Sequence, residues 1–286
     1  MLKPWLLAAR PKTLSASVVP VLIGTALAPR PILWSMFAFA LIGALCIQIA
    51  TNFVNDALDF RKGADTVERL GPTRVTQAGL ISADQVLRAA YVFFTIAGLC
   101  GVPLILRGGW PLLAIGLTSV AAAYIYTGGP YPLAYNGLGE LFVMIFFGFV
   151  AVGGSYYVQA LTISAEVVLG GFIAGSLATV LLVINNLRDV ESDRKTNKRT
   201  LAVRLGEKFS RYEIALFAFA PFLAQFFIAE LRRTDRMLIP LIAMLVAFRL
   251  IHRVFASSGR ELNRCLALAG LLQWLFGILF VVATAL

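Results

Sequence analysis

Long apolar runs recur along the whole chain and are separated by short polar segments. Most are roughly 18 to 25 residues long, the length that a helix needs to cross a bilayer. With Pro, Gly and charged residues as boundaries, the pattern predicts an all-α polytopic membrane protein in which residues 1–286 form a single transmembrane domain. The predicted spans cover residues 13–29, 32–57, 84–106, 109–127, 136–160, 164–188, 210–231, 236–256 and 262–286.

Composition supports the same class. The 286 residues are 59% hydrophobic and only 14% charged, whereas soluble domains are about 25% charged. No polar stretch is long enough to form a separate soluble core. The net charge of +10 is not arranged as a basic stripe interleaved with aromatic residues, so we expect the lipid bilayer and no nucleic acid as a partner.

Basic residues are unevenly shared between the two sides of this predicted topology. All but five of the 25 Lys and Arg residues lie at the N-terminus or in the second, fourth, sixth and eighth loops. The positive-inside rule then predicts a multi-pass protein of the inner (cytoplasmic) membrane, with the N-terminus and these loops in the cytoplasm and the C-terminus outside. The five exceptions are Arg30, Arg107, Arg232, Arg233 and Arg236.

The end of the second span carries costly polar side chains. Asn52, Asp56 and Asp59 are spaced i, i+4, i+7, which places them within roughly 60° of one another on a helix. Ionisable residues within a membrane segment usually face a bundle interior or a wet cavity and indicate a functional site. This face could hold a divalent cation, although a solvated helix end with a cap would show the same residues.

A second polar cluster closes the sixth span. Asn185, Asp189 and Asp193 are spaced i, i+4, i+8 and cover about 80° of a helix face, with Asn186 beside them. Two such clusters on one predicted side make the solvated-end explanation weaker. Bases follow both clusters: Arg61, Lys62 and Arg74 after the first, and Arg194, Lys195, Lys198, Arg199 and Arg204 after the second.

Carboxylates and bases in this arrangement suit a diphosphate bound through Mg²⁺. Mg²⁺ prefers oxygen ligands and commonly bridges one or two carboxylates to phosphate oxygens. Lys and Arg neutralise the remaining phosphate charge, Arg through a bidentate fork. Together these groups stabilise the negative charge on a departing diphosphate.

The competing class is a cation-coupled transporter, in which carboxylates lie near the bilayer midplane on broken helices. Here the carboxylates lie at span ends, beside loops rich in Lys and Arg. This position favours phosphate chemistry over ion coupling.

Two strings of residues resemble the UbiA superfamily of intramembrane prenyltransferases. Asn55–Asp59 with the downstream Asp65 resembles the family's first motif, and Asp189–Asp193 resembles its second. The resemblance spans nearly the whole chain. It implies nine transmembrane helices around a central cavity, capped by the two motif loops, and Mg²⁺ as the cofactor.

Three longer strings resemble the 1,4-dihydroxy-2-naphthoate prenyltransferases within that superfamily: Arg10–Leu14, Gly71–Gly79 and Asn185–Gly206. The reaction implied joins a polyprenyl or phytyl diphosphate to 1,4-dihydroxy-2-naphthoate. It releases CO₂ and diphosphate and gives demethylmenaquinol or its phylloquinone-pathway equivalent. Tail length stays open.

The resemblance also implies roles for individual residues, with Asp56, Asp59, Asp65, Asp189 and Asp193 as catalytic positions. The metal would be held by Asn52, Asp56, Asp59, Asp189 and Asp193, and the diphosphate by Asn52, Arg74, Asn185, Asn186, Lys198 and Arg199.

The acceptor side is less defined. Many aromatic prenyltransferases of this superfamily have an Arg-Pro pair followed by Ser-Gly, where this chain has Arg74–Val75 and Gln77–Gly79. The naphthoate type accommodates this departure better, while homogentisate and 4-hydroxybenzoate remain alternative acceptors. Asp65, Tyr126 and Tyr135 are candidates for moving a proton or orienting the acceptor.

Overall fold

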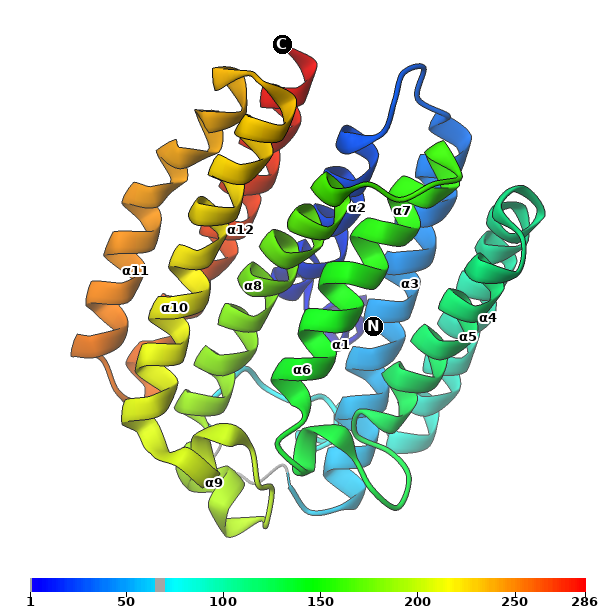
Figure 1. Ribbon diagram of the computed structural model, residues 1–286. Helices are drawn as coiled ribbons and strands as arrows, with labels where there is room; N and C mark the ends of the chain where they lie inside the picture. The colour runs from blue at the N-terminus through cyan, green and yellow to red at the C-terminus, as the bar shows by residue number, and fades with distance from the viewer. Residues whose placement is uncertain (1, 65–69) are drawn as a thin grey trace.

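The computed structural model describes residues 2–64 and 70–286, and within these ranges it contains helices and turns but no strand. The long helices run side by side as a bundle, and the segments that connect them gather at its two ends (Figure 1). The helices are α1 Leu2–Ala9, α2 Ser15–Leu27, α3 Trp34–Arg61, α4 Ala83–Gly108, α5 Trp110–Ile125, α6 Gly139–Val143, α7 Ala151–Ala160, α8 Ala165–Arg188, α9 Val190–Lys195, α10 Leu201–Arg232, α11 Met244–Ala256 and α12 Leu262–Ala285.

Each predicted span falls on a helix, but the expected count of nine is not confirmed. In the described chain, seven helical segments are long and apolar enough to cross a membrane. An eighth is reached only if α1 and α2, bent by 49° at the break between them, form one span. The helix α5 is shorter, because the chain turns at Tyr126. The seven are Trp34–Arg61, Ala83–Gly108, Gly139–Ala160, Ala165–Arg188, Leu201–Arg232, Asp235–Ala256 and Gly259–Ala285.

Local sequence sets several helix ends. α4 begins with a capping box, in which the Ser82 hydroxyl accepts from the backbone N–H of Gln85, and this satisfies a donor that the helix leaves open. Gly109, with φ 72°, ends the same helix. Thr200 caps α10, and Gly206, with φ 87°, breaks that helix six residues later.

α8 lies at the centre of the bundle. Of its most apolar stretch, 72% is buried against other helices, more than for any of the other six spans. It packs closely on the π-helical segment Met144–Val150 through facing glycines. An ideal Cβ on Gly148 would lie 2.5 Å from the Gly171 carbonyl oxygen and 2.9 Å from the Gly175 Cα. Because α8 is packed on several sides, its neighbours fix the position of its C-terminal end, where the second polar cluster lies.

Apolar packing forms two clusters. The larger is buried among α2, α8, α10 and α12, where the Phe222 and Phe276 rings lie 5.5 Å apart. The smaller joins α1, α3 and α4 through the rings of Trp5, Phe53 and Phe93. The polar end of α3 therefore belongs to one cluster and the polar end of α8 to the other.

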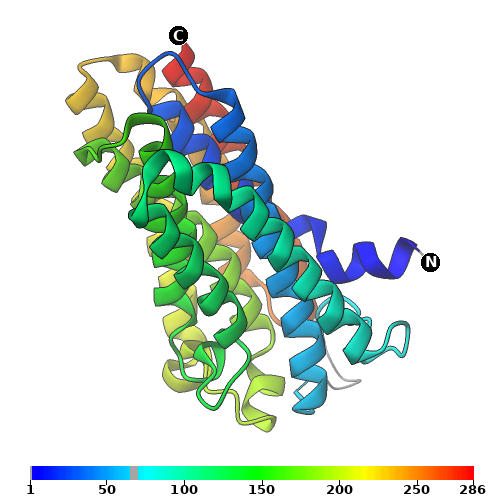
Figure 2. The same cartoon turned by 90° about the vertical axis from the view of Figure 1, so that its right-hand side faces the viewer.

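The two polar ends nevertheless meet. In Figure 1, α9, the end of α3 and the loop before α6 all lie at the lower end of the bundle, opposite the C-terminus. Figure 2 shows α1 projecting sideways from the bundle rather than continuing along it. The ends of α3 and α8 thus share one face of the molecule.

Candidate active site

Asp59 lies two residues before the end of α3 and is only 6% exposed. The Tyr135 hydroxyl donates to its Oδ1 at 2.8 Å. The Arg74 guanidinium donates to its Oδ2 at 3.3 Å. A charge-assisted hydrogen bond and a phenol therefore hold this carboxylate in a fixed direction.

Asp56 anchors the segment that follows the first motif. Its carboxylate accepts from the backbone N–H of Val75 at 3.3 Å, from the N–H of Thr76 at 3.1 Å and from the Thr76 hydroxyl. With 1% exposure, it fixes the loop against α3. A metal role for Asp56 stays a prediction, and the structure gives this residue a second task.

The two asparagines of the first motif face different partners. Asn52 donates to the Ala9 carbonyl at 3.0 Å and to the Thr13 hydroxyl at 3.3 Å. Asn55, which was not among the predicted site residues, accepts from the Thr127 hydroxyl. Both asparagines line the internal cavity described below.

The Asp189 carboxylate is held by the adjacent residue, Arg188. Arg188 donates to both carboxylate oxygens, at 2.8 and 2.6 Å. Its third nitrogen donates to Asn263 of α12 at 2.9 Å, and the Asn263 amide donates to the Leu70 carbonyl at 3.1 Å. This chain of contacts ties the second motif to the segment that follows the first.

Asp193 lies in α9 and is 7% exposed. Lys198 lies 3.5 Å from its Oδ1. Its Oδ2 is buried and has no hydrogen-bond donor within the described part of the chain. Burial raises the pKa of this carboxyl to about 6, against the attraction of Lys198. Oδ1 thus pairs with a base, and Oδ2 is left for a further ligand.

Tyr135 joins the two motifs physically. Two ammonium groups lie over its ring, Lys62 at 4.8 Å and Lys198 at 5.8 Å from the centroid, which is cation–π geometry. Its carbonyl accepts from the Arg199 N–H at 3.0 Å. With its hydroxyl on Asp59, this one residue contacts segments from both halves of the chain.

A buried acid behind the site was missed by the sequence analysis. Glu140 of α6 is 6% exposed and accepts from the Asn186 amide at 2.9 Å. The signal was available, because Glu140 is the one acid within the predicted span 136–160. Tyr126 lines the cavity described below, and its part in moving a proton or orienting the acceptor stays a prediction.

Three predicted site residues remain: the side chains of Arg199 and Asn185 contact other groups, and Asp65 is not among the described residues. The Arg199 side chain is exposed and bonds Asn197 at 3.3 Å, so only its backbone reaches Tyr135. Asn185 donates to the Leu181 carbonyl at 3.1 Å and lines the cavity. Asp65 falls outside the described residues.

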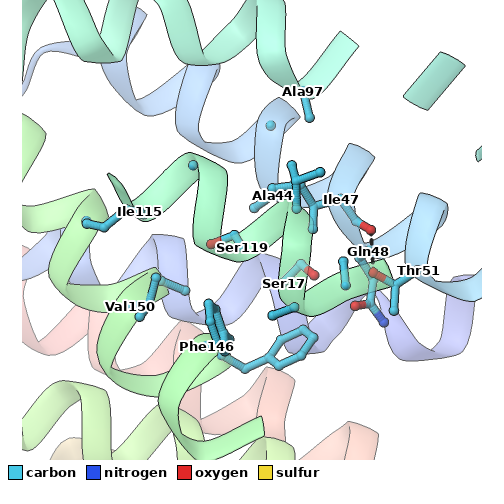
Figure 3. A pocket seen from close by; sticks show the side chains of 18 of the residues that line it. Ser17, Ala44, Ile47, Gln48, Thr51, Ala97, Ile115, Ser119, Phe146 and Val150 are labelled. Carbon is cyan, nitrogen blue, oxygen red and sulfur yellow. Dashed lines mark hydrogen bonds between the residues drawn. The ribbon is translucent and has the colours of Figure 1, made fainter. Parts of the chain in front are cut away.

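The cavity has a volume of about 750 Å³ and extends from the motif end into the bundle. Amides and hydroxyls line one part, and apolar side chains of α3, α4, α5, α7 and α8 line most of the rest. In Figure 3, Gln48, Thr51 and Ser17 lie on one side of it, whereas Ile115 and Val150 lie on the other. Three lining glycines, Gly98, Gly101 and Gly116, have no atom within 4 Å of an added Cβ. The cavity thus has a polar mouth and a roomy apolar interior.

The side chains suit a magnesium ion in kind. Within the described residues, no three His, Cys, Asp or Glu side chains are grouped closely enough to enclose a metal by themselves. Asp59, Asp189 and Asp193 provide carboxylate oxygens, and Asp193 Oδ2 has no hydrogen-bond donor among the described residues. Mg²⁺ normally takes only one or two carboxylates and completes its shell with waters and phosphate oxygens. The donor set therefore fits a metal that binds together with a phosphate ligand.

Comparison with known proteins agrees with this picture. The UbiA prenyltransferase family matches residues 17–277. The chain is 36% identical to the 1,4-dihydroxy-2-naphthoate octaprenyltransferase of Haemophilus influenzae over 98% of its own length and 94% of that protein. It is 40% identical to the Escherichia coli protein of the same name over 72% and 70% of the two chains. A UbiA homolog from Archaeoglobus fulgidus, solved with GPP and Mg²⁺, is 13% identical with a TM-score of 0.72, covering 99% and 100% of the two chains.

Proposed function

The chain belongs to the UbiA prenyltransferase family, and from that premise we propose the reaction that this prenyltransferase carries out. It transfers a polyprenyl or phytyl group from its diphosphate to 1,4-dihydroxy-2-naphthoate, with loss of CO₂ and diphosphate. The product is demethylmenaquinol or its phylloquinone-pathway equivalent. The enzyme then acts in menaquinone biosynthesis or the corresponding phylloquinone pathway. The names of the relatives at 36% and 40% identity support the naphthoate acceptor.

One observation carries this proposal. Two carboxylate-bearing ends, far apart in sequence, meet around Tyr135 at the mouth of a largely apolar cavity. A polar, cationic mouth suits a diphosphate, and an apolar interior suits an isoprenoid tail. The family assignment favours an enzyme over the cation-coupled transporter.

Residues at the mouth have two roles, to bind the diphosphate and to bind the metal. Arg74 and Lys198 bind diphosphate oxygens, with Asn185 and Asn186 nearby on α8. Mg²⁺ would be held by Asp59, Asp189 and Asp193, with Asn52 and Asp56 as the remaining predicted ligands. When bound, the metal supplies positive charge that stabilises the departing diphosphate. Asp65 stays a candidate for the same group.

The side chains that line the cavity determine which molecules can reach the reactive allylic carbon. The allylic C–O bond breaks, the electron pair leaves with the diphosphate, and the electron-rich ring of the acceptor attacks the allylic carbon. Apolar lining such as Ile47, Phe146 and Val150 excludes water, which would otherwise capture the cation. Tyr126, which also lines the cavity, is a candidate for orienting the acceptor. Loss of the acceptor carboxylate as CO₂ restores the aromatic ring.

We also propose the complete topology. The bent pair α1–α2 and the short helix α5, added to the seven longer spans, give nine crossings of the inner membrane. The even loops and the N-terminus then lie in the cytoplasm and the C-terminus outside, as the positive-inside rule predicts. Cysteine labelling of single-cysteine variants from either side of sealed vesicles tests this arrangement.

The reaction is tested with the detergent-purified protein, octaprenyl or phytyl diphosphate, and the naphthoate acceptor. We expect a prenylated, decarboxylated product by mass spectrometry, its loss on chelation of divalent metal, and recovery with Mg²⁺. Asp189→Ala should lose turnover, whereas Glu207→Ala, at an exposed position, should retain it. Equal competition by homogentisate or 4-hydroxybenzoate would contradict the naphthoate acceptor, and undiminished turnover in Asp189→Ala would contradict the metal role.

A further inference from the structure

The cavity contains a single basic residue. Arg10 is the only Lys or Arg among the described residues that line it, and no Asp or Glu is found among them. Its Nη2 is shielded from solvent. Arg74, Arg188 and Lys198, which each contact a motif carboxylate, are not among these lining residues. The cavity therefore has a cation that stands apart from the cations of the phosphate end.

The backbone at Arg10 is held in an unfavourable conformation. Its φ of 51° and ψ of 66° lie in the left-handed region, which costs about 1–2 kcal/mol for a residue other than Gly. The Thr13 N–H and hydroxyl both donate to the Arg10 carbonyl, at 2.9 and 3.0 Å. Strain of this kind persists where the surroundings enforce it and is concentrated at functional sites.

The position of Arg10 is fixed relative to the first motif. The adjacent Ala9 carbonyl accepts from Asn52, which also donates to Thr13. Asn52 lies one helical turn before Asp56 on α3, and a turn rises about 5.4 Å. A ligand group bound by Arg10 would therefore lie close to the mouth where the diphosphate is expected.

A second polar group nearby needs a donor. Gln48 is 8% exposed, lines the cavity and donates weakly to the Thr13 hydroxyl at 3.5 Å. Its Oε1 is buried and receives no hydrogen bond from the described residues. A buried acceptor without a donor is costly, and a ligand O–H would satisfy it. In Figure 3, Gln48 lies beside Thr51 on the polar side of the cavity.

We propose that Arg10 and Gln48 form the acceptor subsite. Arg10 binds the carboxylate of a hydroxylated aromatic acid, and Gln48 Oε1 accepts a hydrogen bond from one of its ring hydroxyls. A guanidinium fork matches a carboxylate in plane and charge. This inference rests on the proposed function, because it assigns the acceptor position of the same site. It makes Arg10 a residue that selects acceptors carrying a carboxylate.

Steady-state kinetics with two acceptors test the proposal: 1,4-dihydroxy-2-naphthoate, and 1,4-dihydroxynaphthalene, which lacks the carboxylate. Arg10→Gln should raise the KM for the acid at least about tenfold, the value of a charged hydrogen bond. Its KM for the prenyl diphosphate and for the ring without carboxylate should change less than about twofold. Gln48→Leu should raise the KM for both acceptors by similar factors.

Two further variants complete the design. Lys12→Gln removes an exposed cation two residues away and should behave as wild type. Arg10→Lys keeps the charge without the fork, so it should give an intermediate KM for the acid and carries the test if Arg10→Gln does not fold. An unchanged KM for the acid, or an equal rise in the KM for the diphosphate, would overturn the assignment. Failure of the wild-type protein to prenylate either acceptor would instead refute the proposed function.

Discussion

At the scale of single residues, Tyr135 makes the most consequential contacts of the site. Its hydroxyl bonds Asp59, and its ring lies against Lys62 and Lys198. The hydroxyl and the ring act separately, because removal of the oxygen leaves both cation–π contacts in place. Removal of this one oxygen therefore tests how much turnover depends on the orientation of the Asp59 carboxylate.

We expect Tyr135→Phe to lower turnover by about tenfold, since a hydrogen bond to a charged group contributes roughly 1.5–3 kcal/mol. Thermal unfolding should change little. Tyr131→Phe is the matched control, because Tyr131 lies on the same loop and is 61% exposed. Identical kcat values in the two variants would show that the Asp59 contact has no role in turnover.

Substitutions of Asp56 and Asp59 should have different effects on the loop that follows the first motif. Asp56→Asn weakens three contacts that hold the loop at Val75 and Thr76, so both activity and resistance of this loop to proteolysis should fall. Asp59→Asn weakens one contact to the same loop, from Arg74, but keeps the three Asp56 contacts, so it should lose activity with the loop better protected than in Asp56→Asn. Limited proteolysis followed by mass mapping distinguishes them, and equal protection in both variants would refute the anchoring role of Asp56.

The sequence predicted the helical face of the first motif but not these partners. Spacing alone places Asn52, Asp56 and Asp59 together. It carries no information about which carboxylate meets the loop and which meets Tyr135, because those contacts depend on chain segments tens of residues away. Asn263, which joins Arg188 to Leu70, has no recognisable signal within the predicted span 262–286.

At the scale of elements, hydrophobic runs predicted where helices occur, and punctuation residues predicted most ends. Two irregularities of the helices were not predicted from the sequence. The break between α1 and α2 follows from the left-handed Arg10, a conformation unusual for Arg. The π-helical segment Met144–Val150 is enforced by close glycine packing against α8, a tertiary contact that a period of 3.6 residues does not reveal.

That packing yields a stability prediction. Gly148→Ala places a Cβ against the Gly171 carbonyl, so we expect destabilisation of about 1–3 kcal/mol and a lower apparent Tm in detergent. Gly153→Ala, where nothing lies within 4 Å, should be neutral or slightly stabilising, because Ala favours a helix. Equal Tm values for the two variants would contradict the close approach of α8.

At the scale of the whole molecule, the cavity connects the motif end, where we place the diphosphate, to the apolar interior, where we place the tail. Its walls come from seven α-helices, α2 to α8, and no local pattern predicted its volume. Glycines face it where added atoms would meet only open space. The room available for the tail is therefore set by residues that look unremarkable in sequence.

Filling that room should change the donor preference. Gly116→Leu should lower kcat/KM for octaprenyl diphosphate by about tenfold, since overpacking costs about 1–3 kcal/mol, and affect geranyl diphosphate much less. Gly153→Leu, outside the lining, is the control. A uniform loss for both donors would indicate a folding defect instead of a shortened tail site.

The ion pairs of the site are also local in sequence, and this matters for how the protein is made. Asp59 meets Arg74, Asp189 meets Arg188, and Asp193 meets Lys198. Each acid thus emerges from the ribosome with its counter-ion at most 15 residues away in the chain. Since chains fold from the N-terminus during synthesis and an unpaired buried charge is costly, each half of the site can enter the bilayer neutralised before the other half exists.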